Sequence, residues 1–408
     1  MSSKNKTAAT KDDVKLALAP KLRFSGSKFS RNWEVKQLGQ IAVNLDNRRI
    51  SIKSSDRIPG DIPYYGASGI VDYVKGFIFD EDLLCVSEDS PNLVTRNYPI
   101  AFAIKGKAWV SNHAHVLGFE NECTLRFVEL YLNSIKLDDF ISGVAQPKLK
   151  KAMLDRIPIP YPSLSEQKSI ADCLGSIDAI IVAQLHKISA LRNFKKGLVS
   201  EIFPRESKDK PSLRFSAFQS AGEWRKMKLG EAAKFYSGRA YKQEELLESG
   251  KYPVLRVGNF SGSDIWYYSN LELDDDKYCE SGDLLYALSM PFGPRIWRGK
   301  KSIYHYQICK VIEEFGIDKQ FIFNTLEKET ENMRAKTTSG LGVMRINKGG
   351  VEKWISTFPT IAEQKKIVGC LASLEDSIAA EIKKVDALKI HKEGLMRQIF
   401  PSLDVIKL

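Results

Sequence analysis

The sequence predicts an α+β protein in which two divergent α/β domains are joined by two long helices. Three observations support this. The chain repeats itself, each repeat ends in a long stretch of heptad periodicity, and the rest of each repeat holds short β-type runs broken by Gly, Pro, Asn and Asp. With 408 residues, 43% of them apolar, the chain can build two or three domains with real cores. We expect the two helices to form an antiparallel intramolecular coiled coil with pseudo-two-fold symmetry.

The repeat is visible as similar segments at fixed offsets. PKLRFS at residues 20–25 returns as PSLRFS at residues 211–216. Residues 162–204 and 359–401 are identical at 19 of 43 positions, and both end in Ile-Phe-Pro. Between these segments the two repeats hardly match. Each repeat is therefore a divergent domain followed by a preserved helix.

This pattern divides the chain into seven segments. They are a basic tail that we expect to be flexible (1–30), a first variable domain (31–161), a first long helix (162–204), a linker (205–221), a second variable domain (222–358), a second long helix (359–401) and a C-terminal tail (402–408).

Each preserved segment is predicted to be one helix that starts after a proline and ends before another. Ser163 or Ser165 is the expected N-terminal cap of the first helix. Apolar residues recur at alternating steps of four and three, and eight of ten seam positions are apolar in each helix. The alternative is an amphipathic helix that lies on its own domain.

Polar residues interrupt both seams at the same two positions. These are Gln184 and Lys195 in the first helix, and Glu381 and Lys392 in the second. Facing residues of an antiparallel pair have a constant index sum, and a sum of 576 matches Gln184 with Lys392 and Lys195 with Glu381. We predict that these two buried polar layers set the register, because such layers often do so in coiled coils.

The net charge of +11 favours a polyanionic partner, although residues 1–30 alone hold seven basic and two acidic groups. Elsewhere, local basic and aromatic clusters predict DNA contact, because basic groups hold phosphates and polar side chains read base edges. For any single cluster, the alternative is a solvated surface loop. The clustered residues are Arg48, Arg49, Lys148, Lys150, Lys151, Arg239, Tyr241, Lys242, Arg295, Trp297, Arg298, Arg345 and Lys348.

Searches for catalytic and metal-binding motifs find none that fits. The chain has no Pro-Pro and no Pro-Asp dipeptide, which removes the usual elements of an adenine methyltransferase and weakens those of a restriction nuclease. Residues 293–300 differ from a P-loop in spacing, and Lys301 follows where Ser or Thr should stand. His113 and His115 lack a third metal ligand in sequence, and Cys85 lacks a nearby His. We predict no catalytic residue and no metal site.

The arrangement resembles the specificity (S) subunit of type I restriction–modification systems over nearly the whole chain. The matching segments are residues 64–70, 112–117, 146–149, 157–160 and 165–168 with the helix that follows, and then 255–259 and 282–285. The second repeat departs from the pattern at residues 343–346 and 355–358. Gln146, Arg256 and Asn259 lie in these segments, and His305 of the second repeat matches His113 of the first, so we add Gln146, Arg256, Asn259 and His305 to the predicted DNA contacts.

The resemblance implies a non-catalytic subunit in which each domain reads one half of a bipartite, asymmetric site on double-stranded DNA. It implies that the helices set the spacer and dock two methyltransferase subunits, which carry S-adenosylmethionine and methylate adenine at N6. Two restriction–translocase subunits, where present, use ATP and Mg. We expect a cytoplasmic protein without a membrane partner. Two alternatives remain: a self-sufficient DNA-modifying enzyme with a disguised active site, and a coiled-coil scaffold that does not touch DNA.

Overall fold

The computed structural model describes residues 20–24, 33–143, 145–204, 210–260, 262–337, 346–402 and 406. It divides into two units: unit 1 combines residues 1–186 with 382–408, and unit 2 is residues 187–381. The division crosses both long helices, so each unit holds one variable domain and one half of each helix. Of the basic tail that was predicted to be flexible, only residues 20–24 lie within the described part of the chain.

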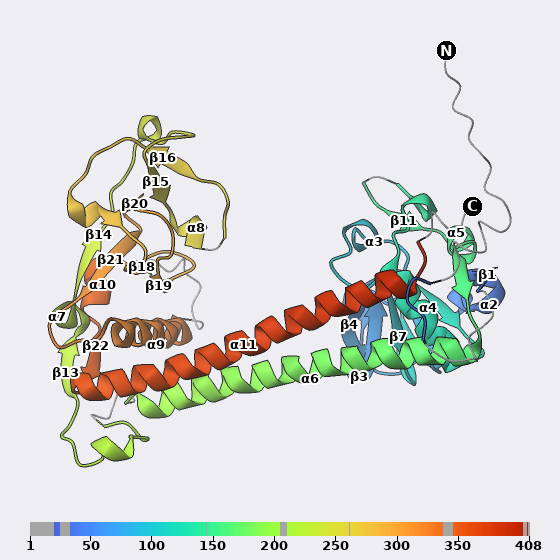
Figure 1. Ribbon diagram of the computed structural model, residues 1–408, viewed down its shortest axis with the longest axis horizontal. Helices are drawn as coiled ribbons and strands as arrows, with labels where there is room; N and C mark the ends of the chain where they lie inside the picture. Colours follow the sequence, from blue (N-terminus) through green and yellow to red (C-terminus); the bar gives the residue numbers. More distant parts are fainter. Residues whose placement is uncertain are drawn as a thin grey trace. The chain divides into compact units, whose positions relative to one another are not determined.

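Two four-stranded sheets form most of the variable domain of unit 1 (Figure 1). Their strand orders are β2-β9-β6-β7 and β4-β3-β8-β5, and β3 and β8 are parallel. A separate ribbon pairs β1 with β12, so the domain's first strand lies beside the strand that leads into the long helix. The elements are β1 (Glu34–Gln37), α2 (Leu38–Ile41), β2 (Val43–Asn44), η2 (Asp46–Arg48), β3 (Pro59–Gly66), β4 (Gly69–Val74), β5 (Phe79–Asp80), β6 (Leu83–Ser87), α3 (Asn92–Thr95), β7 (Ala101–Ile104), β8 (Lys107–Val110), β9 (Ala114–Gly118), α4 (Glu122–Ser134), β10 (Ile141–Ser142), β11 (Lys148–Leu149), α5 (Lys151–Asp155) and β12 (Pro158–Tyr161).

The variable domain of unit 2 has the same strand topology. Its sheets have the orders β14-β21-β18-β19 and β16-β15-β20-β17, with β15 and β20 parallel, and its ribbon pairs β13 with β22. This confirms the prediction that both domains share one α+β fold. The elements are β13 (Arg225–Lys228), α7 (Leu229–Ala232), β14 (Ala233–Ser237), β15 (Tyr252–Leu255), α8 (Val257–Phe260), β16 (Tyr267–Ser269), β17 (Tyr278–Cys279), β18 (Leu284–Ala287), β19 (Gly293–Ile296), β20 (Ser302–Tyr304), β21 (Ile308–Glu313), α9 (Lys319–Thr337), α10 (Lys348–Glu352) and β22 (Ile355–Phe358).

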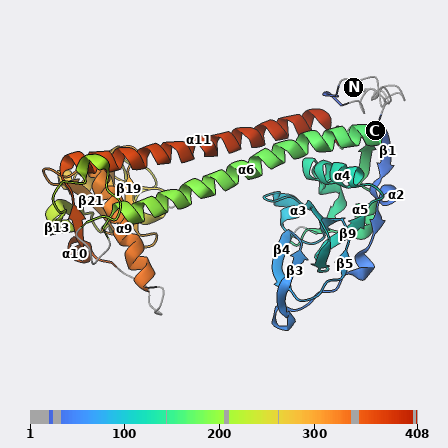
Figure 2. The same ribbon diagram turned by 90° about the horizontal axis from the view of Figure 1, so that it is seen from below.

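The two predicted long helices are α6 (Leu164–Ile202) and α11 (Ile361–Ile399), and each has 39 residues. Within each unit they run antiparallel and side by side (Figures 1 and 2). Ser163, one of the two predicted caps, accepts the N–H of Glu166 (3.4 Å). Every predicted seam position is buried or half-buried, whereas the side chains of Phe194 and Ile390, off the seam, are 59% and 67% exposed. The coiled coil and its seam are therefore confirmed.

The predicted register is wrong. Lys195 binds Glu375 (2.5 Å) and not Glu381, while Glu381 binds Lys187. The ammonium of Lys392 binds the carboxylate of Asp178 (2.7 Å to each oxygen). These pairs have index sums of 568 and 570, about one heptad below the predicted 576.

The physical reason is the number of apolar seam residues that find a partner. At an index sum of 569, all ten seam positions of α6 meet all ten of α11, whereas a sum of 576 leaves two apolar end positions of each helix without a partner. Each seam lysine then faces an aliphatic residue and extends its ammonium to a carboxylate beside the seam. The side chains of Lys195 and Lys392 stay 22% and 21% exposed, so their charges are not fully desolvated. Pairing the apolar residues at the helix ends outweighs the matching of polar positions.

The C-terminal end of each long helix packs into the core of a domain. In unit 1, the ring of Phe400 contacts Phe127 and Tyr131 of α4, both at 5.5 Å between centroids. In unit 2, Phe203 stacks on Phe321 of α9 at 5.3 Å. Each helix therefore starts at the domain of its own repeat and ends in the domain of the other repeat.

By length and mean hydropathy (1.3) alone, α6 could cross a membrane, with 17% of the apolar window buried. This is weak evidence, because helices of soluble proteins pass the same test. The buried positions of α6 form the seam against α11, and Asp172 and Asp178 interrupt the apolar sequence.

Replacing Phe400 with Ala should lower the free energy of unfolding of unit 1 by about 3–5 kcal/mol, because it empties a buried aromatic site. Urea unfolding followed by hydrogen exchange of the α4 amides measures this. Phe194→Ala, on an exposed face of α6, is the matched control and should change stability by less than about 0.5 kcal/mol. Equal effects of the two substitutions would contradict the anchoring role of Phe400.

Candidate nucleic-acid interface

Three loops of unit 2 converge and bring together predicted contact residues from distant parts of the sequence. Arg239 and His305 form a parallel β-bridge. The backbone N–H of His305 donates to the carbonyl of Leu255 (3.0 Å), which precedes Arg256. Arg239, Arg256 and His305 are therefore neighbours, although they lie in the loops that follow β14, β15 and β20.

Arg256 and His305 offer groups that can contact a ligand. The Arg256 side chain is exposed and lies over the ring of Tyr267 (5.2 Å), and among the described residues no carboxylate is within ion-pair distance of it. Burial, and then the charge of Arg256, lower the pKa of His305, so its imidazole is neutral at pH 7 and can both donate and accept hydrogen bonds. Its ring lies 4.2 Å from that of Tyr306, which is 52% exposed. Tyr306 was missed at the sequence level, where its position next to His305 was the only signal.

Of the other predicted contacts at residues 239–242, Arg239 and Tyr241 are held by contacts within the domain, whereas Lys242 is exposed. Arg239 donates two hydrogen bonds to Glu245 (3.1 and 2.7 Å), and this pairing raises its pKa. Tyr241 is half-buried, and its hydroxyl donates to a backbone carbonyl (3.4 Å). Lys242 is exposed and lies 3.7 Å from Glu244. Arg239 and Tyr241 therefore shape the loop.

Asn259 does not have a free amide to read a base, which corrects its predicted role. Its Oδ1 accepts the N–H of Arg256 (3.0 Å), and its Nδ2 donates to the carbonyls of Ser263 (3.1 Å) and Ile265 (3.0 Å). Both ends of the amide are thus engaged within one loop. Asn259 holds the loop that presents Arg256.

The end of β19 and the loop after it contain both structural and exposed residues. The indole N–H of Trp297 donates to the carbonyl of Lys300 (2.9 Å), and its ring packs near Trp266 (6.4 Å) against a core cluster. Arg295 and Arg298 are exposed, with no carboxylate at ion-pair distance in the described part of the chain. The two arginines remain candidate contacts, and Trp297 supports the loop from within.

In unit 1, Arg48 and Arg49 do not form a basic surface patch. Arg48 binds Glu81 (2.7 Å) and lies over the ring of Phe79 (4.6 Å). The Arg49 side chain is only 12% exposed, and it donates to Glu88 (2.7 Å) and to a backbone carbonyl (2.7 Å). The guanidinium of Arg49 is engaged by partners within the domain, which argues against the predicted contact with DNA.

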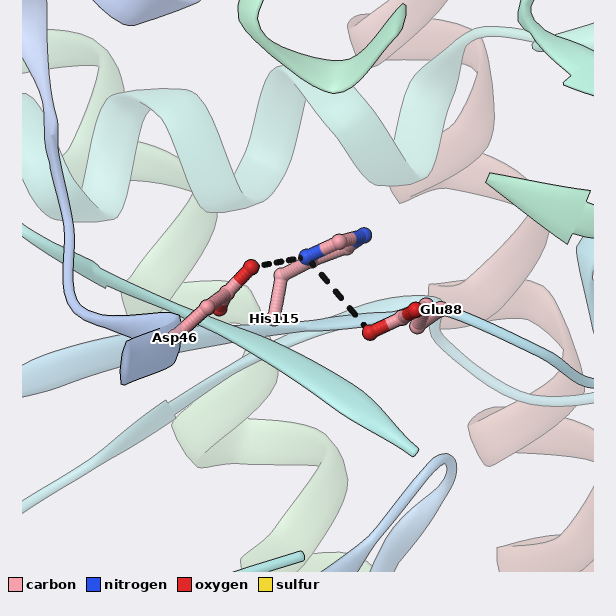
Figure 3. A group of neighbouring side chains, drawn as sticks. All are labelled: Asp46, Glu88 and His115. Carbon is pink, nitrogen blue, oxygen red and sulfur yellow. Dashed lines mark hydrogen bonds and ion pairs between the residues drawn. The ribbon is translucent and has the colours of Figure 1, made fainter. Parts of the chain in front are cut away.

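Arg49 belongs to a network around a buried histidine. Figure 3 shows the ring of His115 between two carboxylates, with Nδ1 2.6 Å from Asp46 and 3.8 Å from Glu88. Its Nε2 lies 2.7 Å from a backbone carbonyl, so both ring nitrogens face acceptors. Arg49 also approaches Asp46 (3.4 Å), and Lys148 approaches Glu88 (3.1 Å).

These contacts make the network an internal ion-pair cluster. Burial is the largest influence and raises the pKa of Asp46 and of Glu88, but the hydrogen bonds and charges of their partners, led by His115 for Asp46 and by Arg49 for Glu88, together outweigh it, and both pKa values are lowered. Asp46, Glu88 and His115 each place a potential metal-ligand atom within 4.8 Å of the other two, as a metal site would require. The carboxylates of Asp46 and Glu88, however, already bind cationic side chains. His113 is separate: it is exposed and binds Asp89 (2.8 Å).

The remaining predicted contacts are exposed or lie outside the described residues. Gln146, Lys150 and Lys151 are exposed, and within the described residues neither lysine has a carboxylate at ion-pair distance. Lys348 pairs with a glutamate one helical turn later (3.5 Å). Arg345 lies outside the described residues.

Two domains of one topology that carry different charged and aromatic loops have the architecture of a modular recognition protein. The sequence matches the type I restriction modification DNA specificity domain twice, over residues 30–191 and 221–389. The chain belongs to this family.

Individual relatives agree with this assignment. A Haemophilus influenzae protein assigned as a type I restriction enzyme specificity subunit is 28% identical over 348 residues, which are 84% of this chain and 87% of the relative. The type I restriction enzyme MjaVIII specificity subunit of Methanocaldococcus jannaschii is 25% identical over 397 residues, 91% of this chain and 92% of the relative. In fold, the chain resembles the crystal structure of the S subunit from M. genitalium, with a TM-score of 0.57 at 16% identity over 94% of this chain and 99% of that one.

Replacing Arg49 with Met should destabilise unit 1 by about 3 kcal/mol, because it leaves buried carboxylates with fewer cationic partners. The salt dependence of DNA binding should not change. Chemical unfolding with hydrogen exchange of β6 and β9 measures the first effect, and DNA retention at increasing salt measures the second. Arg298→Met removes an exposed arginine and should change stability by less than about 0.5 kcal/mol. A stable Arg49→Met variant with a reduced salt slope would restore the original prediction.

Proposed function

We propose that this chain reads a bipartite, asymmetric DNA site, one variable domain to each half, as the specificity subunit of a type I restriction–modification complex. Membership of the family supports a DNA specificity protein with a non-catalytic role. One observation supports the division of the DNA site between the two domains: both domains share their strand topology but differ in the corresponding loops. The turn between β8 and β9 is Ser-Asn-His, whereas the turn between β20 and β21 is His-Tyr-Gln.

The exposed groups suggest which residues contact DNA. In the second domain, Arg256, His305 and Tyr306 combine a cation, a neutral imidazole and an exposed ring, and such groups bind phosphates, base edges and base faces. Arg295 and Arg298 add exposed positive charge. In the first domain, the corresponding proposal rests on Gln146, Lys150 and Lys151, whose side chains are exposed.

We further propose that α6 and α11 set the spacer between the half-sites and dock two methyltransferase subunits. Apolar side chains outside the seam support docking, since Val182, Leu185 and Ile390 are 50%, 46% and 67% exposed. In this complex the methyltransferase subunits would hold S-adenosylmethionine, and two restriction–translocase subunits would use ATP and Mg. The chain itself would act in the cytoplasm on double-stranded DNA.

Replacing residues 31–161 with the corresponding domain of another family member tests whether each domain recognises its half-site independently. In cells that carry the partner subunits, one half of the methylated motif should change and the other half should stay the same, because each domain reads alone. Methylome sequencing measures both halves together. A simultaneous change of both halves would contradict the proposal.

Replacing Arg256 with Ala should weaken specific DNA binding by the assembled complex by about 1–3 kcal/mol if it contacts a base, or lower the salt slope by about one if it contacts a phosphate. Either effect should be confined to the half-site of the second domain. Lys234→Ala removes the same charge from a residue that pairs with Glu314 (3.3 Å) and is the matched control. Equal binding by the two variants would exclude Arg256 from the interface.

A further inference from the structure

The repeated Leu-Arg-Phe segment that precedes each variable domain connects the two long helices. In unit 1, Arg23 donates two hydrogen bonds to the carboxylate of Glu166 (2.8 and 2.9 Å), in the first turn of α6. The N–H of the preceding residue, Leu22, donates to the carbonyl of Gln398 (3.0 Å), in the last turn of α11. Two adjacent residues therefore bind the start of one helix and the end of the other.

Unit 2 repeats these contacts with the helices exchanged. Arg214 donates two hydrogen bonds to Glu363 (both 2.7 Å), in the first turn of α11. The N–H of Leu213 donates to the carbonyl of Glu201 (2.9 Å), in the last turn of α6. We call residues 20–24 and 211–215 the clasps.

The carboxylates at the centre of the clasps are buried, so each depends on its arginine as a partner. The side chains of Glu166 and Glu363 are each 1% exposed, so a carboxylate without its arginine would be desolvated and uncompensated. A bidentate pair also fixes the direction of the guanidinium. The carboxylates lie in the first helical turn, where the helix dipole favours negative charge.

A glutamine follows each buried glutamate and links the first turn of the same helix to the domain by hydrogen bonds. Gln167 accepts the hydroxyl of Thr124 (2.8 Å) and donates to the carbonyl of Pro162 (2.9 Å). Gln364 accepts the N–H of Asp318 (2.9 Å) and donates to the carbonyl of Pro359 (2.8 Å). The Glu-Gln pair that recurs in both repeats therefore joins clasp, helix and domain.

We propose that the clasps hold α6 and α11 in one register, and that Arg23 and Arg214 are positioning residues that determine the spacer between DNA half-sites. This inference rests on the proposed function. It follows from geometry: one helix cannot slide past the other while a two-residue segment binds both. A slip of one heptad would move a helix by about 10 Å, or about three base pairs of DNA. The half-exposed polar positions in the middle of the coil give no comparable constraint.

Opening both clasps in matched variants separates positioning from stability. Arg23→Met together with Arg214→Met leaves Glu166 and Glu363 buried and unpaired, so it should destabilise both units and also relax the spacer. Adding Glu166→Met and Glu363→Met removes the buried charges and should recover most of the stability while both clasps stay open. In this fourfold variant, methylome sequencing of the assembled complex should show methylation of sites with altered spacers rising about tenfold over the unaltered complex, with both half-site sequences unchanged.

The control is Lys105→Met, which breaks an exposed ion pair with Glu122 (2.7 Å) in the same unit and should leave the spacer strict. A fourfold variant that regains stability and keeps a single spacer length would overturn the inference and leave the proposed function intact. If the unaltered complex methylates no bipartite motif, the proposed function fails and the clasp loses its role in the spacer. Thermal unfolding of each variant supplies the stability measurement.

Discussion

Burial of both ends of each long helix is the constraint on which the structure depends. Phe203 and Phe400 enter domain cores, and Glu166 and Glu363 are buried under arginines from the clasps. Buried aromatic rings and desolvated bidentate ion pairs tolerate small displacements poorly. The middle of the coil is different, because its seam lysines keep their ammonium groups partly in water and find carboxylates nearby. The buried ends therefore reinforce the register that the apolar seam favours, and the polar positions in the middle of the coil adapt to it.

This constraint explains why the chain can vary its domains and keep its helices. Each unit contains all partners of these contacts: a domain, the start of one long helix, the end of the other and a clasp that binds both. The residues that make these contacts lie in the preserved segments or on one helix of each domain, α4 or α9. The loops that follow β14, β15 and β20 take no part in them. Substitution in those loops can change what a domain recognises without moving the helix ends.

Electrostatics inside the domains limits which basic residues can meet DNA. Arg48 binds a glutamate 33 residues away, and Arg49 binds one 39 residues away. In a sequence window such arginines look unopposed, because their partners come from other strands. Arg256, Arg298 and Lys150 have no carboxylate at ion-pair distance among the described residues, and their charge is available to a phosphate. Fewer basic residues are therefore available to contact DNA than the net charge of +11 suggests.

The sequence by itself determined the repeat, the boundaries of α6 and α11, their apolar seams and the shared α+β class, because heptad periodicity and internal identity are local properties that packing preserves. It also indicated the family, through motifs distributed along nearly the whole chain. Only the tertiary structure decided the coil register, because in the sequence the pairing of apolar seam residues competes with the matching of polar positions, and only the structure showed that Phe203 and Phe400 enter domains of the other repeat. Likewise, only the fold showed that Arg49 and Asn259 are engaged internally and that Arg256, His305 and Tyr306 meet. Such pairings join residues far apart in sequence, and neither periodicity nor composition carries information about them.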